Sequence, residues 1–141
     1  MTSVSPNAES QLLSENEYEV VRLLMDMPFD SSLVGFAFLC EAIQEVVNSN
    51  SFQVNLSKNI YSVIAQRHNI SISQVDKSIR NLLYNASNYA TNINEILFPT
   101  MIIKNAFVST KTKSFITAVA DFIKVSRRKL EYQRALKFAK I

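Results

Sequence analysis

Residues 61–81 carry the feature that most constrains this fold, two short helical stretches joined by a tight turn. Asn69 occupies the turn, and asparagine accepts a left-handed backbone more readily than most non-glycine residues. Two helices cross this closely only when small or apolar side chains line their contact, and Ala65 and Ser78 are small. The spacing therefore predicts a helix-turn-helix.

The second stretch has one apolar side and one polar side. If Val75 and Ile79 point inward, hydroxyl, amide, carboxylate and cationic groups face outward. Such groups suit the base edges of the DNA major groove. Asp76 is equally well explained as a carboxylate favoured by the helix dipole in the first turn. We expect double-stranded DNA as the ligand and the base contacts to come from Ser73, Gln74, Asp76, Lys77, Arg80 and Asn81.

Further basic residues are candidates for contacts with the DNA backbone. Phosphate contacts provide affinity and salt dependence but carry no sequence information. Two of these bases flank Thr112, where a helix is expected to begin, and a helix N-terminus favours phosphate. The alternative for each is an ordinary solvated charge. The predicted phosphate contacts are Lys58, Arg67, Lys111 and Lys113.

Charge is unevenly distributed along the chain. Residues 1–60 hold two bases and eight acids, a net −6, whereas residues 61–141 hold thirteen bases and four acids, a net +9. The total is the formal +3. A basic half that begins at the helix-turn-helix is typical of a protein that binds a polyanion.

Composition excludes several classes of function. The single glycine rules out glycine-rich nucleotide loops, and one His with one Cys leaves no metal or acid–base cluster. We therefore expect no enzyme activity, cofactor, metal or small-molecule substrate, and we interpret His68 and Cys40 as packing residues. No apolar run approaches the ~18 residues of a membrane span. With one cysteine and no signal peptide, a cytoplasmic location is expected.

Helix-period apolar residues predict an all-α fold of about six helices. The first helix should run from Glu15 to Met25 after a capping box at Ser14, burying Tyr18, Val21, Leu24 and Met25. A central helix should follow, capped by Asp30 or Ser31 and ending at Val47. The two helices of the motif are expected at Asn55–His68 and Ser73–Tyr84, with Ser73 and Asp76 capping the second. A single helical turn at Asn94–Leu97 and a helix that starts at Thr112 or Ser114 complete the expected elements. The expected organisation is a flexible lead (1–13), a helical DNA-binding domain (14–124) and a basic helical extension (125–141).

Four segments resemble a known family in order and spacing. They are Gly35-Phe36-Ala37-Phe38-Leu39 with Glu41-Ala42-Ile43, Lys58-Asn59-Ile60-Tyr61 with Ile64-Ala65, Val75-Asp76-Lys77-Ser78-Ile79-Arg80, and Ser114-Phe115-Ile116 with Val119-Ala120-Asp121. From about Leu23 to Lys129 the chain is similar to the C-terminal effector domain of the sporulation response regulator, the master transcription factor of endospore-forming bacteria. The resemblance implies a wingless all-helical domain that binds DNA through its second motif helix, as tandem copies or a homodimer, and contacts RNA polymerase.

The chain departs from the family pattern at named positions. The family has arginine at position 74 and histidine at position 81, where this chain has Gln74 and Asn81. Arginine suits guanine and glutamine suits adenine, so a different operator is expected. No phosphorylatable receiver domain precedes the matching region, and we interpret the chain as a natural stand-alone protein without phosphorelay control.

Two functions remain open at this point. One is a sequence-specific transcription regulator. The alternative is a receiver-less interaction module that modulates a full-length regulator or RNA polymerase without reading DNA. The extension at residues 125–141 is compatible with pairing to a second copy, with lying along DNA, or with a membrane surface.

Overall fold

The computed structural model describes residues 15–49, 55–89 and 96–139, and every regular element in these ranges is helical. The predicted all-α fold with six α-helices is confirmed within this part of the chain. The elements in order are α2 (Glu15–Met25), α3 (Val34–Asn48), the π-helical η1 (Leu56–Tyr61), α4 (Ser62–His68), α5 (Ile72–Tyr89), α6 (Met101–Val108) and α7 (Thr112–Ala139).

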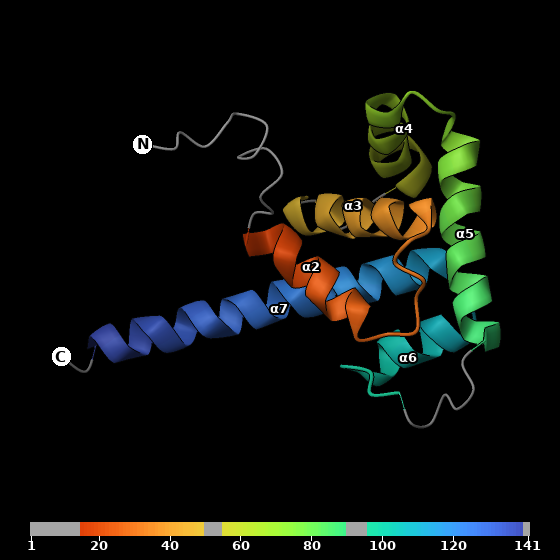
Figure 1. Cartoon of the computed structure of the whole chain (residues 1–141). Coiled ribbons are helices and arrows are strands. Elements are labelled where there is room, and N and C mark those ends of the chain that lie inside the picture. Colours follow the sequence, from red (N-terminus) through yellow and green to blue (C-terminus); the bar gives the residue numbers. More distant parts are fainter. Residues whose placement is uncertain (1–14, 50–54, 90–95, 140–141) are drawn as a thin grey trace, which may run out of the picture.

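Helix α3 lies at the centre of the molecule, as expected. It packs against α2, α5 and α7 and also contacts η1 and α4 (Figure 1). Burial of a large apolar side chain stabilises a fold by about 1.5–3 kcal/mol, so this helix supplies much of the core energy. Its buried residues are Gly35, Phe36, Phe38, Leu39, Ala42, Ile43, Val46 and Val47.

The start of α3 differs from the prediction. Helix α3 begins at Val34, with Leu33 at the N-cap and no side-chain capping bond. The Asp30 carboxylate instead accepts hydrogen bonds from the Ser32 N–H at 3.0 Å and the Ser32 hydroxyl at 2.6 Å. These bonds hold the pKa of Asp30 below its usual value. The prediction was wrong because aspartate can close a local turn as readily as it caps a helix.

Helix α2 has the predicted bounds but buries a different face. Val20 and Leu24 are buried one turn apart, and Val21 is only half-buried. Tyr18 and Met25, both expected inside, are 56% and 62% exposed. The face that packs on α3 is rotated by about one residue from the expected stripe, and the sequence alone does not show where the partner helix lies.

Helix α6 was not anticipated. Thr100 caps it by accepting a hydrogen bond from the Ile103 N–H at 3.1 Å, and Ile103, Ala106 and Phe107 are buried. Two expectations, the capping box at Ser14 and the first half of the turn at Asn94–Leu97, lie outside the described residues. An eight-residue helix contains too few periods for its apolar pattern to stand out.

Aromatic rings join α6 and α7 to the entry of α3. The ring of Phe29 packs at 5.7 Å from Phe107 and 5.8 Å from Phe115, measured between centroids. Phe98 lies 5.2 Å from Phe107 in the same way. This cluster anchors the first turns of α7 beside the core.

Helix α7 starts at Thr112, one of the two predicted positions, and continues for 28 residues. At 1.5 Å per residue it is about 42 Å long. It buries Phe115, Ile116, Val119 and Ile123 in its first half, whereas residues 128–139 are all exposed. The second half projects beyond the rest of the molecule (Figure 1). Within the described residues, no helix combines the length and apolarity that crossing a membrane requires.

Candidate nucleic-acid interface

The turn between α4 and α5 has the predicted geometry. Asn69 follows α4 in the left-handed region with φ 55° and ψ 48°. The Ile70 N–H then donates to the Ala65 carbonyl at 2.9 Å, which closes the end of α4. The next helix begins at Ile72, so α4, this turn and α5 form the helix-turn-helix.

The first motif helix is preceded by a π-helical turn. Asn55 caps it by accepting a hydrogen bond from the Lys58 N–H at 3.0 Å. The expected single helix from Asn55 to His68 is therefore η1 followed by α4. The wider turn buries Ile60 and Tyr61 against the core and leaves Lys58 exposed. Such π-turns are frequent at functional sites.

An ion-pair network attaches α4 to α3. The Arg67 guanidinium contacts Glu41 at 2.6 Å and Glu45 at 3.0 Å, and hydrogen bonds to both carboxylates raise the pKa of Arg67. His68 Nε2 lies 2.7 Å from Glu41, and its ring packs edge-on against Phe38 at 5.0 Å. Arg67 therefore links α4 of the motif to α3 in the free protein, although it was predicted to contact phosphate.

The cap of α5 lies two residues before the expected one. Gln74 Oε1 accepts a hydrogen bond from the Ser71 N–H at 2.9 Å, and Ser71 Oγ accepts one from the Gln74 N–H at 3.1 Å. This reciprocal pair is a capping box, and the predicted Ser73–Asp76 cap was wrong. Gln74 must leave this box before both ends of its amide can meet an adenine.

Burial settles the orientation of α5. Val75 and Ile79 are 0% exposed, while Ser73, Lys77 and Asn81 are exposed on the opposite side. Gly35 of α3 fits directly beneath this helix, because a Cβ at Gly35 would lie 2.4 Å from the Ser78 carbonyl oxygen. The polar face of α5 is thus held outward by close backbone contact with the central helix.

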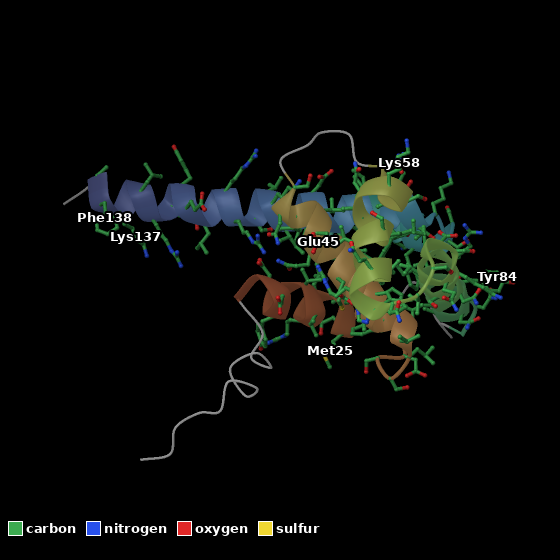
Figure 2. All side chains as sticks on the ribbon, turned by 90° about the horizontal axis from the view of Figure 1, so that it is seen from above. Met25, Glu45, Lys58, Tyr84, Lys137 and Phe138 are labelled. Atoms are coloured by element: carbon green, nitrogen blue, oxygen red, sulfur yellow. The ribbon has the colours of Figure 1, made fainter. Side chains whose placement is uncertain are left out.

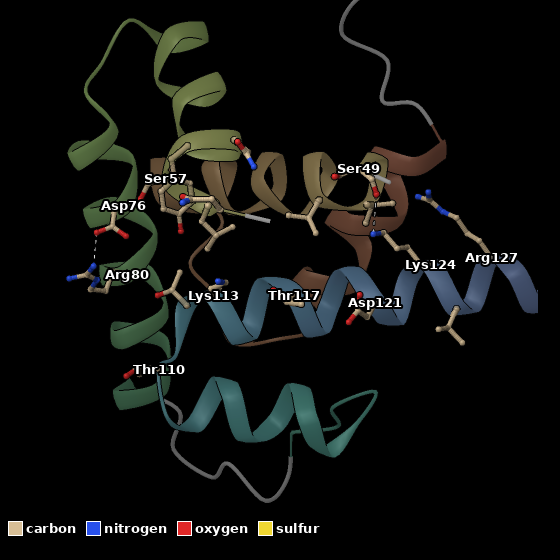
Figure 3. A pocket seen from close by; sticks show the side chains of 18 of the residues that line it. Ser49, Ser57, Asp76, Arg80, Thr110, Lys113, Thr117, Asp121, Lys124 and Arg127 are labelled. Carbon is tan, nitrogen blue, oxygen red and sulfur yellow. Dashed lines mark hydrogen bonds and ion pairs between the residues drawn. The ribbon is translucent and has the colours of Figure 1, made fainter. Parts of the chain in front are cut away.

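Asp76 and Arg80 form an ion pair on one flank of α5. Arg80 Nη2 lies 2.6 Å from Asp76 Oδ2, and their side chains are 65% and 34% exposed, respectively. Figure 3 shows the two side chains projecting from successive turns of the helix. The guanidinium is accessible to a ligand, but the carboxylate beside it is partly shielded from water.

Tyr84 belongs to the exposed face and was not selected from the sequence. It is 55% exposed and lies two turns after Lys77, because α5 continues to Tyr89, five residues past the predicted end. Figure 2 shows Tyr84 at one end of the molecule, opposite Lys137 and Phe138. The signal was present in the sequence, since Tyr84 continues the spacing of Lys77 and Arg80.

A polar groove separates α5 from the first half of α7, with η1 on its third side. Asp76 and Arg80 line it from α5 and Lys113 from the first turn of α7 (Figure 3). Of the predicted site residues, these three share the groove. Lys58 and Lys111 are exposed nearby in sequence but do not line it.

Other reactive groups give no sign of a chemical site. Burial raises the pKa of the half-buried Cys40 thiol to about 12, so the thiol is protonated at neutral pH. In the described ranges, no three His, Cys, Asp or Glu side chains are placed to hold a metal ion.

An outward polar helix held by a left-handed turn, within a wingless all-helical domain, defines a helix-turn-helix DNA-binding domain. The family model described as sporulation initiation factor Spo0A C terminal matches residues 20–126. This chain belongs to that family, which consists of DNA-binding effector domains of a sporulation regulator and is not a family of enzymes. No solved structure matches the chain.

Proposed function

We propose that this protein is a transcription regulator that binds double-stranded DNA in a sequence-specific way, with α5 in the major groove. The observation that carries the proposal is the complete burial of Val75 and Ile79. That burial turns the polar face of α5 outward, where a groove 12 Å wide admits a helix. The membership of the chain in a family of DNA-binding domains supports the same function.

The base contacts are assigned to the exposed face of α5. Arg80 reads guanine with its forked guanidinium, and Asn81 reads adenine with its amide. Lys77 and Ser73 supply further donors, while Gln74 and Asp76 take part once their partners within α5 release them. Tyr84 extends this contact surface toward the C-terminal end of α5.

The phosphate contacts are assigned to exposed bases on either side of α5. Lys113 lies in the first turn of α7, where the amide N–H groups and the helix dipole also favour an anion. Lys111 and Lys58 are exposed as well. Arg67 is the weakest of the four candidates, because Glu41 and Glu45 already occupy its guanidinium.

Selection from a pool of random duplexes at physiological salt tests the proposed function. The wild-type chain should enrich one short sequence motif. A variant with Lys77→Ala and Arg80→Ala is the matched control, because both side chains are exposed and the fold should be retained. Recovery of no motif by the wild-type chain would rule out sequence-specific binding.

The proposal also includes the partners that the family implies. They are tandem binding on DNA, a homodimer and contact with RNA polymerase. If no motif is enriched, the protein instead acts through protein contacts. The exposed Tyr132 and Leu136 on the projecting half of α7 are then the surface for that role.

A further inference from the structure

The hydroxyl group of Tyr61 is buried and has no hydrogen-bond partner among the described residues. Tyr61 closes η1, and the residue is only 2% exposed. Buried tyrosine hydroxyls usually find a partner, and leaving one unpaired destabilises the fold. Phenylalanine would fill the same space without that cost, so packing alone does not explain a tyrosine at this position.

Tyr61 shares the groove with the two charged residues of the α5 ion pair. Tyr61, Asp76 and Arg80 line the same groove. Burial raises the pKa of Tyr61 well above its ordinary value, and the negative charge of Asp76 adds to the rise while Arg80 opposes it. The hydroxyl is therefore protonated near neutral pH and is available as a hydrogen-bond donor.

The ion pair creates a conflict for DNA recognition. In the free protein Arg80 Nη2 lies 2.6 Å from the Asp76 carboxylate. Bidentate recognition of guanine needs two donors of the guanidinium aimed at one base edge. When Arg80 turns to the base, it leaves behind a carboxylate that is only 34% exposed. A partly shielded carboxylate gains from a hydrogen-bond donor beside it, so a second donor for Asp76 favours this movement of Arg80.

We propose that Tyr61 is a positioning residue for DNA recognition by Arg80. Its hydroxyl donates a hydrogen bond to the Asp76 carboxylate when Arg80 moves from that carboxylate to a guanine. No proton is transferred in this exchange. The inference rests on the proposed function, because it assumes that Arg80 contacts a base.

Replacing Tyr61 by phenylalanine has opposite expected effects on folding and on binding. The Tyr61→Phe variant loses an unpaired buried hydroxyl, so the free protein should unfold at the same temperature or a higher one. Specific affinity should fall about tenfold to a hundredfold, the effect of one hydrogen bond to a charged group. Binding to unrelated DNA should not change, since a buried hydroxyl touches no phosphate.

The experiment is a competition gel shift with the duplex selected by the wild-type chain. It compares wild type, Tyr61→Phe, Asp76→Ala and the double variant, with thermal unfolding of each protein measured alongside. Tyr18→Phe is the matched control, because Tyr18 is an exposed tyrosine on α2. Tyr61→Phe should weaken specific binding alone, and it should have no further effect once Asp76 is replaced.

Three results would overturn the inference while leaving the proposed function standing. They are full specific affinity in Tyr61→Phe, additive losses in the double variant, and an equal loss of specific and unrelated binding with a lowered unfolding temperature. A wild-type chain that prefers no duplex gives a different outcome, because it removes the proposed function itself.

Discussion

Arg80 is committed to a partner on its own helix before it meets any ligand. Its ion pair with Asp76 joins residues four apart on α5, and the guanidinium stays largely exposed. Exposed pairs of this spacing contribute only about 0.3–0.5 kcal/mol to stability. The pair therefore orients the Arg80 side chain but adds little to the free energy of unfolding. Arg80 can leave Asp76 for a contact with DNA.

Replacing Arg80 by alanine should weaken specific binding by about 1–3 kcal/mol, the usual effect of losing a bidentate base contact. The free energy of unfolding should change little, since the ion pair is exposed. A gel-shift competition between the selected duplex and a random one measures the loss. Arg134→Ala, which removes the same side chain from the exposed half of α7, should retain full discrimination. Equal behaviour of the two variants would remove Arg80 from the base contacts.

The helices position these residues through a few close contacts. Helix α5 is held by its cap at Ser71 and by the approach of Gly35 to the Ser78 backbone. The cap defines where the helix starts, and the glycine contact defines which face is outward. Each contact predicts a different consequence when it is removed.

Replacing Ser71 by alanine should lower the free energy of unfolding by about 1 kcal/mol, the usual loss for an N-cap side chain. Ser73→Ala is the matched control, because Ser73 is exposed in the first turn and makes no capping bond there. It should leave stability nearly unchanged and act on DNA binding instead. Chemical denaturation of both variants distinguishes them. A larger loss of stability for Ser73→Ala would indicate that Ser73 caps α5, as expected from the sequence.

Replacing Gly35 by alanine should destabilise the fold, since the new Cβ would lie 2.4 Å from the Ser78 carbonyl oxygen. Overpacking of this kind costs about 1–3 kcal/mol, which exceeds the gain of about 1 kcal/mol in helix propensity. The same displacement of α5 should weaken DNA binding. Ala37→Gly, on the exposed side of α3, measures the propensity effect alone. An increased melting temperature for Gly35→Ala would contradict the close approach.

The whole molecule separates charge in space as well as along the chain. Acidic residues of α2 and α3 pair with bases of other helices, as in the contact of Arg127 with Glu19 at 3.0 Å and of Arg67 with Glu41. Residues 61–141 carry a net +9, and Lys77, Lys111 and Lys113 of this segment are exposed on α5 and at the start of α7. A basic face at one end of the molecule attracts DNA, with a strength that falls as salt rises.

Replacing Lys113 by alanine should weaken binding to all duplexes alike. The slope of log affinity against log salt should become less steep by about 0.9, the value for one phosphate contact. Lys137→Ala removes the same charge from the far end of α7, which projects away from α5 (Figure 2). Its salt slope should match that of the wild type. A flatter slope for Lys137→Ala would instead place the projecting half of α7 along the DNA.

Local patterns in the sequence were sufficient for much of this architecture. The left-handed Asn69, the burial of Val75 and Ile79, the ends of α2 and the start of α7 depend on backbone preferences and helical periodicity within a few residues. These are short-range properties, so neighbouring residues determine them. The outward set on α5 follows directly from that periodicity.

Only the tertiary structure decided which partners the side chains have. The pairing of Arg67 with Glu41, the fit of Gly35 under Ser78 and the gathering of Tyr61, Asp76 and Lys113 along one groove join residues far apart in sequence. Contacts of this kind depend on how the helices pack against one another, and a single sequence carries no direct signal of that packing.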